Sequence, residues 1–309
     1  RGMARRAVEK LAAEAGLALG PTGGILVDEH LRTSDPYIYA AGDAIQVKDL
    51  VLGRDALFPL AGPANRQGRL VADNIAGRTA SYRGAQGTAI ARVMDLVIAV
   101  TGANAKTLQA MGREHLACHI HPAAHATYYP GGSQMSLKLL FEPGGGRVLG
   151  AQIVGFEGVD KRIDVLATAI RAGMTVFDLQ ELELAYAPPF SSAKDPVNMA
   201  GYTAGNILSG DVEVVYWDQV PEMVRQGAFL VDVRTAREHE QGAVPGARNI
   251  PVDELRARLE EIPRDRTVLV YCQVGLRSYV ASRILRQRGF AVKNISGGYK
   301  LYEVQEWAR

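Results

Sequence analysis

The sequence predicts a multidomain protein that joins an α+β region to a C-terminal α/β region with a parallel sheet. The chain has 309 residues, enough for two or three hydrophobic cores. Residues 83–207 alternate or run apolar between glycine turns and then continue as helices, which indicates an α+β layer. From about residue 210 strands and helices alternate regularly, a pattern typical of a parallel sheet covered on both faces.

Composition excludes several classes of partner. The net charge is +2, and no stretch carries a dense run of Lys or Arg, so neither a nucleic acid nor an anionic membrane is an expected partner. No apolar run reaches the roughly 18 residues that a membrane span needs, and we expect a cytoplasmic protein. The two cysteines, Cys118 and Cys272, lie far apart, which fits a reducing compartment and leaves room for a reactive thiol.

The N-terminal segment "GPTGGILVDEHLRTSDPYIYAAGDAIQ" contains glycine turns and two expected strands, "ILVDE" and "YIYAAGD". The second strand is expected to end at Asp43. A carboxylate at that place suits a ribose-type hydroxyl, and it equally suits the cap of a helix.

The stretch "TSDPYIYAAGD" resembles the second flavin-binding motif of the pyridine nucleotide-disulfide oxidoreductase family, in which the last aspartate binds the ribityl chain of FAD. The following "FPLAGPANRQGRLVADNIAG" resembles the helix whose N-terminus faces the flavin ring in that family. The resemblance implies that Asp43 is the ribityl ligand and that Gly42 permits close approach. It also implies that the backbone of Ala61 and Gly62 faces the ring.

Other parts of that family's machinery are not found in this sequence. Two Gly-x-Gly-x-x-Gly loops and an N-terminal redox cysteine are expected in the family, whereas the densest glycine cluster here, residues 144–146, reads as a hairpin turn. We therefore expect residues 1–82 to be the C-terminal segment of a truncated FAD/NAD-binding region. Such a segment should hold FAD poorly, and NAD(P)H would bind only through the missing N-terminal region.

Residues 83–209 resemble the dimerisation domain of the same family, which implies a homodimer. The stretches "GVDKRIDVLATAI" and "AYAPPFSSAKDPVNMAGYTAGN" are similar to the coenzyme A-disulfide reductase and NADH oxidase branch. In this branch a tyrosine replaces the His-Glu pair of other members, so Tyr186 is implied as a neighbour of the reductase active site. A packing role for Tyr186 before the Pro-Pro turn stays open.

The stretch "ACHIHPAAH" places Cys118 close to His119, His121 and His125. Strand alternation would bring His119 and His121 to one face, as a metal site requires. The spacing matches no closed zinc pattern, so we expect a strand edge with exposed histidines and no metal.

The last domain, residues 210–309, contains the strand "TVLVYC", which ends at Cys272 and runs into a short loop and a helix. Gly275 is expected where the backbone needs positive φ or close approach, and Ser278 is expected to cap the helix. Backbone amides, a helix N-terminus and a guanidinium around one thiol should lower its pKa and make it a nucleophile.

The stretches "FLVDVRTAREHEQGAVPGARNIPVDEL", "VLVYCQVGLRS" and "GFAVKNISGGY" resemble the rhodanese domain. Four residues separate Cys272 from Arg277, the spacing of the sulfurtransferase loop rather than of the longer phosphatase loop. The resemblance implies that Cys272 carries a persulfide, that Arg277 closes the cradle, and that the backbone of Gln273, Val274, Gly275, Leu276 and Ser278 stabilises the charge. Asp232 and Arg234 are expected to form a structural pair, and Arg237 and Glu238 are expected to face solvent.

The function predicted from these features is transfer of sulfane sulfur through Cys272, in the C-terminal part of a flavin-dependent disulfide, persulfide or polysulfide reductase. Expected donors are thiosulfate, polysulfide and the persulfides of coenzyme A or glutathione, with thiols as acceptors. Two alternatives remain open. The chain is either part of an FAD- and NAD(P)H-dependent disulfide oxidoreductase with an accessory rhodanese domain, or a non-catalytic dimer module.

Overall fold

The computed structural model describes residues 2–307, and it divides into two compact units. The first unit comprises the residues up to 91 together with 99–103, and the second comprises 92–98 and 104 onward. The domain boundaries expected from the sequence, at residues 82 and 209, remain predictions. Among the described residues, no helix combines the length and apolar character needed to cross a membrane.

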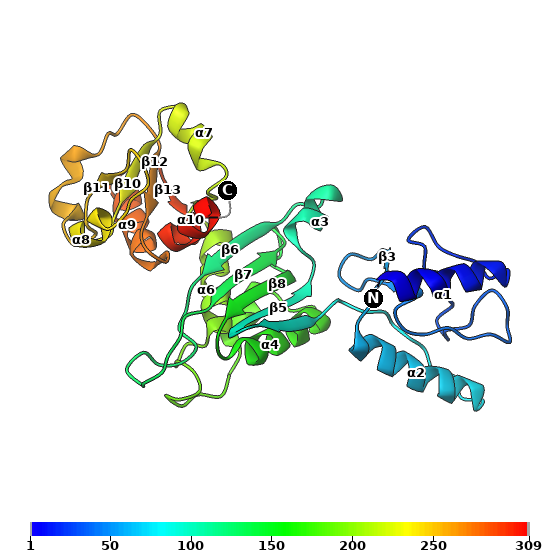
Figure 1. Ribbon diagram of the computed structural model, residues 1–309. Helices are drawn as coiled ribbons and strands as arrows, with labels where there is room; N and C mark the ends of the chain where they lie inside the picture. Colours follow the sequence, from blue (N-terminus) through cyan, green and yellow to red (C-terminus); the bar gives the residue numbers. More distant parts are fainter. Residues whose placement is uncertain (1, 308–309) are drawn as a thin grey trace. The chain divides into compact units, whose positions relative to one another are not determined.

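The first unit contains two helices and a small sheet (Figure 1). Its elements are α1 (Gly2–Glu14), β1 (Ile25–Leu26), β2 (Ile45–Lys48), β3 (Asp55–Ala56) and α2 (Ala61–Ile75). The sheet order is β1-β2-β3, with β1 parallel and β3 antiparallel to β2. A small apolar cluster that includes Ile25, Leu31 and Ile45 forms the core of this unit.

The strand expected over "YIYAAGD" is wrong. Only an isolated bridge between Tyr39 and Arg32 forms there, and the regular strand β2 begins after Asp43 instead of ending at it. The side chain of Tyr37 is 93% exposed, so this apolar-looking run has no core to bury it. Since a strand and not a helix follows Asp43, the alternative of a helix cap is also wrong.

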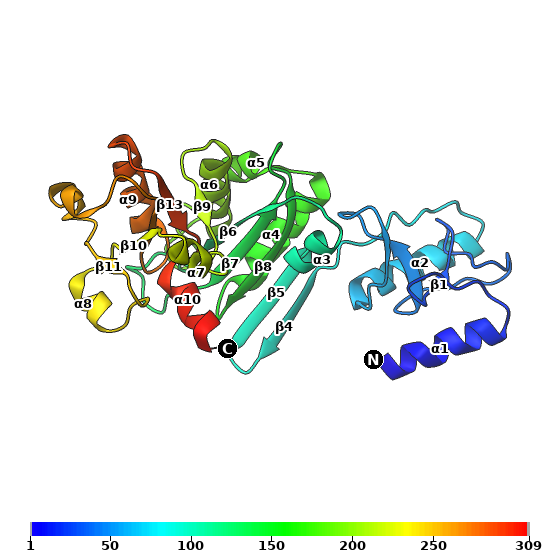
Figure 2. The same cartoon turned by 90° about the horizontal axis from the view of Figure 1, so that it is seen from above.

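A five-stranded sheet with helices packed on it makes up the middle of the chain (Figures 1 and 2). The strand order is β4-β5-β8-β7-β6, formed by β4 (Ala89–Val93), β5 (Leu96–Gly102), β6 (Leu116–Ile120), β7 (Ser136–Phe141) and β8 (Val148–Gly155). The helices are α3 (Ala105–Ala110), α4 (Val159–Ala172), α5 (Val176–Glu181) and α6 (Pro196–Leu208). Helix α4 packs against β8, and α6 packs against β6 and β7. The glycines at residues 144–146 lie in the β7–β8 hairpin turn, as predicted.

The segment "HATYYPG" forms an irregular loop and not the expected strand. Its start is held by Arg162, whose side chain is 1% exposed and donates to the Ala124 carbonyl at 2.8 Å. The same guanidinium pairs with Asp195 at 3.0 Å, and Asp195 caps helix α6. This buried ion pair therefore provides a hydrogen-bond donor to the backbone at the start of the loop, where strand pairing would have provided one from a neighbouring strand.

The C-terminal region is a parallel sheet of order β11-β10-β12-β13-β9. Its strands are β9 (Val214–Val215), β10 (Phe229–Asp232), β11 (Arg248–Asn249), β12 (Val268–Tyr271) and β13 (Val292–Ile295). Its helices are α7 (Val220–Arg225), α8 (Ala236–Glu240), α9 (Leu276–Gln287) and α10 (Gly298–Trp307). Separate apolar clusters lie on the two faces, one with α9 and one with α7 and α10, which is the predicted α/β arrangement.

One helix expected in this region does not form as an α-helix. The stretch "VDELRARLEEI" folds as two 3-10 turns, η1 (Leu255–Ala257) and η2 (Leu259–Glu261). Arg258 leaves the helical region between them with φ −122°, and its side chain pairs with Glu254 and Glu261 on either side. The short strand β11 was not foreseen either, because it lies inside the predicted turn "VPGARNIP".

His119 of β6 and His121, which directly follows this strand, connect the middle sheet to the loop before α10. His119 hydrogen-bonds the Ser296 hydroxyl at 3.0 Å, and His121 donates or accepts at Ser136 (2.8 Å) and contacts the Gly297 carbonyl at 3.0 Å. They share a face, as alternation predicts, but His121 is buried rather than exposed. Burial lowers the pKa of His119 to about 3 and that of His121 to about 4.

These depressed pKa values predict acid sensitivity. In the unfolded chain both imidazoles take up a proton below about pH 6.5, whereas in the fold they stay neutral to about pH 4, so stability falls as the pH drops through this window. Each histidine should cost about 2 kcal/mol at pH 5 relative to pH 8. Urea unfolding at the two pH values measures this loss.

The double variant His119→Asn, His121→Gln should lose less stability between pH 8 and pH 5 than the wild type. His115→Asn is the matched control, because the His115 side chain hydrogen-bonds the Arg113 carbonyl, two residues earlier in the chain. An equal loss in the wild type and the double variant would contradict the burial account.

Candidate active site

Cys272 occupies the predicted place, directly after β12. Its side chain is fully buried and packs with Val231, Val270 and Ala281. In parallel sheets, loops at the carboxyl ends of strands form the binding sites. The neighbouring strand β10 ends at Asp232, opposite Tyr271, so residues that follow both strands meet at the Cys272 loop.

The backbone at Gly275 turns the loop into helix α9. Gly275 has φ +114°, a conformation that L side chains rarely adopt, and it is the N-cap of α9. Its N–H donates to the Cys272 sulfur at 3.1 Å. The positive φ expected here is confirmed, and the helix N-terminus is directed at the sulfur.

Ser278 is not the helix cap. It lies within the first turn of α9, and its hydroxyl is within hydrogen-bond distance of the Gly275 carbonyl (3.0 Å) and the Cys272 sulfur (3.5 Å). The cap lies three residues earlier than expected, at Gly275, which caps the helix through backbone conformation and not through a side chain.

Arg277 lies beside the sulfur and is held by Glu238. The guanidinium makes two bonds to the Glu238 carboxylate, of 2.6 and 2.7 Å, and this pairing lowers the pKa of Glu238 to about 2. Glu238 also raises the pKa of Arg277, and the nearby Cys272 sulfur adds to that effect. The expectation that Glu238 faces solvent is therefore wrong.

Arg234 and Asp232 form the expected structural pair, at 2.7 Å and both buried. Burial opposes ionisation of Asp232, but hydrogen bonds from Arg234 and His239 outweigh it and keep the pKa of Asp232 below its usual value. Arg234 also donates to the Gln273 side chain at 3.2 Å, so the pair supports the first residue of the loop after Cys272.

Helix α10 supports the start of the same loop through backbone hydrogen bonds. The amides of Tyr299 and Lys300 donate to the carbonyls of Cys272 (2.7 Å) and Gln273 (3.0 Å). A Cβ at Gly298 would lie 2.5 Å from the Cys272 carbonyl oxygen, so only glycine permits this approach. Neither Glu238 nor Gly298 was predicted from the sequence as a site residue. The Thr235-x-x-Glu238 capping box and the glycine pair at 297–298 can both be recognised in the sequence. The sequence does not show that they contact Arg277 and the Cys272 loop.

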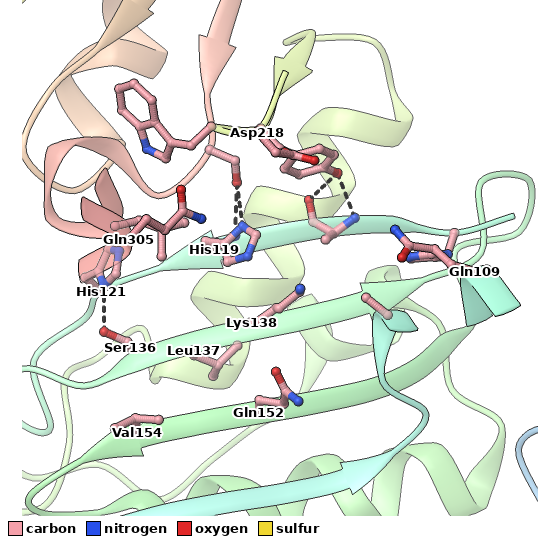
Figure 3. A pocket seen from close by; sticks show the side chains of 17 residues that line it. Gln109, His119, His121, Ser136, Leu137, Lys138, Gln152, Val154, Asp218 and Gln305 are labelled. Atoms are coloured by element: carbon pink, nitrogen blue, oxygen red, sulfur yellow. Dashed lines mark hydrogen bonds between the residues drawn. The ribbon is translucent and has the colours of Figure 1, made fainter. Parts of the chain in front are cut away.

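Two of the cavities in the second unit border the C-terminal region. One, of about 480 Å³, lies between the polar face of β6, β7 and β8 and the C-terminal region. Figure 3 shows Lys138 and Gln152 pointing into it below Asp218. The other, of about 300 Å³, adjoins the Cys272 loop at Val274, Gly275 and Leu276 and reaches Met199 and Tyr202 on α6. Within residues 2–307 no three His, Cys, Asp or Glu side chains gather as a metal site would require.

The residues expected to face a flavin lie together in the first unit. The Gly42 amide donates to the Gln67 side chain of α2 at 2.7 Å, which holds the Gly42–Asp43 turn against that helix. Helix α2 begins at Ala61 and Gly62 without a side-chain cap, so its first amides have no such acceptor. A turn with a carboxylate beside an uncapped helix N-terminus fits the hydroxyls and electron-rich ring edge of FAD.

Tyr186 lies on an exposed segment, with 47% of its surface accessible. Its hydroxyl hydrogen-bonds that of Tyr128 at 3.0 Å, a partner that the sequence did not indicate. The packing interpretation is not favoured by this exposure. The role of Tyr186 as a reductase neighbour stays a prediction.

The chain matches three protein-family models. Residues 3–68 match "Pyridine nucleotide-disulphide oxidoreductase", residues 88–196 match the dimerisation domain of that family, and residues 217–305 match "Rhodanese-like domain".

Solved and curated relatives agree with these matches. Reduced Bacillus anthracis CoADR-RHD is 52% identical with a TM-score of 0.92, over 94% of this chain and 53% of that one. An NAD-dependent persulfide reductase from A. fulgidus is 43% identical with a TM-score of 0.85, over 94% and 52%. Coenzyme A disulfide reductase from Staphylococcus aureus (strain bovine RF122 / ET3-1) is 38% identical over 63% of this chain and 44% of the relative.

The chain thus spans about half the length of these relatives. The recognition made from the sequence motifs is confirmed: this chain joins domains of the pyridine nucleotide-disulphide oxidoreductase family to a C-terminal rhodanese-like domain.

Proposed function

We propose that this chain transfers sulfane sulfur through a persulfide on Cys272. The single observation that carries the proposal is the Cys272 sulfur, which accepts the Gly275 amide at the N-terminus of α9 and lies within electrostatic reach of Arg277. Such donors stabilise an anionic sulfur, in the thiolate and in the persulfide.

The reaction takes place in two displacement steps. The Cys272 thiolate attacks the outer sulfur of a donor, the new S–S bond forms, and the bond inside the donor breaks so that the leaving group takes the electron pair. With thiosulfate the leaving group is sulfite, and with a persulfide it is a thiolate. A thiol or cyanide acceptor then attacks the outer sulfur of the Cys272 persulfide and restores the cysteine thiolate.

Replacing Cys272 tests this function. The variant Cys272→Ser should lower the rate of thiocyanate formation from cyanide and a sulfane donor to the level without protein, because serine cannot hold the sulfur. Cys118→Ser is the matched control: burial raises the pKa of Cys118 to about 12, so it stays a thiol and takes no part. Equal rates in the wild type and Cys272→Ser would contradict the proposal and would favour the alternative of a non-catalytic dimer module.

The relatives suggest that the sulfur transfer belongs to a larger reductase. We propose that the chain is the C-terminal part of a flavin-dependent disulfide, persulfide or polysulfide reductase, and that it forms a homodimer through residues 83–209. FAD would supply electron transfer from NAD(P)H to the sulfur substrate. Asp43 would bind its ribityl hydroxyls, and the backbone of Gly42, Ala61 and Gly62 would approach the ring.

Titration with FAD tests the proposed flavin-binding residues. Asp43→Asn should weaken the binding of FAD about tenfold, because one charge-assisted hydrogen bond is lost, and flavin fluorescence measures the change. Asp73→Asn on the far end of α2 is the control, since that carboxylate pairs with Arg78. Equal affinities in wild type and Asp43→Asn would contradict the assigned role of Asp43.

A further inference from the structure

The charges around the Cys272 loop cancel. Among the described residues, two guanidinium groups lie at the loop: Arg277 beside the sulfur and Arg234 at the Gln273 side chain. Glu238 pairs with Arg277 through two bonds, and Asp232 pairs with Arg234 at 2.7 Å. Each cation therefore has its own carboxylate, and the loop attracts an anion mainly through backbone N–H groups.

The pocket beside the loop is also uncharged. Its volume is about 300 Å³, and no Asp, Glu, Lys or Arg is found in its lining. Apolar side chains such as Met199, Ile207 and Leu276 form much of the wall. His119 and His121 contribute to it, and burial lowers their pKa values to about 3 and about 4, so both are neutral at pH 8. A donor that places an organic group here would bury apolar surface without leaving a charge unpaired.

A dianion gains less at such a site than at one with a free cation. Coulomb energy scales with the charge of the donor, so an unpaired arginine favours a dianion over a monoanion, and a neutralised arginine does not. We propose that Glu238 sets the donor specificity of Cys272: it selects sulfane-sulfur donors with a single negative charge at the reacting group and an uncharged segment next to it, and it disfavours the thiosulfate dianion. This inference rests on the sulfurtransferase function proposed above.

The probes are three donors that react alike at the transferred sulfur. Thiosulfate carries two negative charges, whereas methanethiosulfonate and benzenethiosulfonate carry one. In each case the Cys272 thiolate takes the terminal sulfur and becomes a persulfide anion, and sulfite or the sulfinate leaves with the bonding electron pair. Comparing methanethiosulfonate with thiosulfate tests the effect of the donor's charge. Comparing benzenethiosulfonate with methanethiosulfonate tests the effect of the size of the organic group.

The wild type should show kcat/KM in the order benzenethiosulfonate, methanethiosulfonate, thiosulfate, measured with cyanide as acceptor at pH 8. Glu238→Gln should raise kcat/KM for thiosulfate about tenfold and for methanethiosulfonate about threefold, since the gain of the dianion is the square of the gain of the monoanion. This difference should shrink at high salt, because Arg277 and Glu238 are partly exposed.

Two further variants separate charge from shape. Glu238→Asp keeps the charge and should keep the wild-type ratio of the two small donors. Glu261→Gln removes a carboxylate from another arginine pair of the same domain, with Arg248 and Arg258, and should leave the ratio unchanged.

Equal kcat/KM values of the wild type for thiosulfate and for methanethiosulfonate would overturn the inference. This comparison does not depend on the folding of any variant. Equal factors for both donors in Glu238→Gln, or the same ratio change in Glu238→Asp, would overturn it as well. In each of these cases Cys272→Ser still distinguishes the two proposals: if it abolishes turnover, the sulfurtransferase function stands and only the role of Glu238 is lost. No turnover of any donor by the wild type would instead remove the sulfurtransferase function itself.

Discussion

The left-handed backbone at Gly275 is the constraint on which the Cys272 site depends. Because this residue has φ +114°, its N–H turns back to the sulfur at 3.1 Å, and helix α9 starts at the next residue. A side chain there would strain the turn and move the helix N-terminus away from the thiol. The close approach of Gly298 to the Cys272 carbonyl fixes the same loop from the other side.

Ion pairs complete the site instead of adding free charge to it. Glu238 orients Arg277 through two hydrogen bonds, and Glu238 is itself placed by the capping box of α8 with Thr235. Arg234 is buried, which is tolerable only because Asp232 compensates its charge. The geometry that orients Arg277 beside the sulfur thereby removes most of its net attraction for anions.

The sequence predicted the parts of the fold that follow local rules. Cys272 after an apolar strand, positive φ at Gly275 and the parallel C-terminal sheet are confirmed because periodicity and glycine spacing report them directly. Predictions over "YIYAAGD", "HATYYPG" and "VDELRARLEEI" were wrong because local apolar patterns do not show whether a core exists to receive them. Long-range partners such as Glu238 for Arg277, or Tyr128 for Tyr186, carry no local signal.

Direct detection of the covalent intermediate tests the central claim most simply. The protein is incubated with benzenethiosulfonate without an acceptor, and its intact mass and peptides are then measured. The account predicts one added sulfur atom on Cys272, removed by cyanide, and none on Cys118, whose pKa burial raises to about 12. An unchanged mass, or sulfur on Cys118 in place of Cys272, would contradict it.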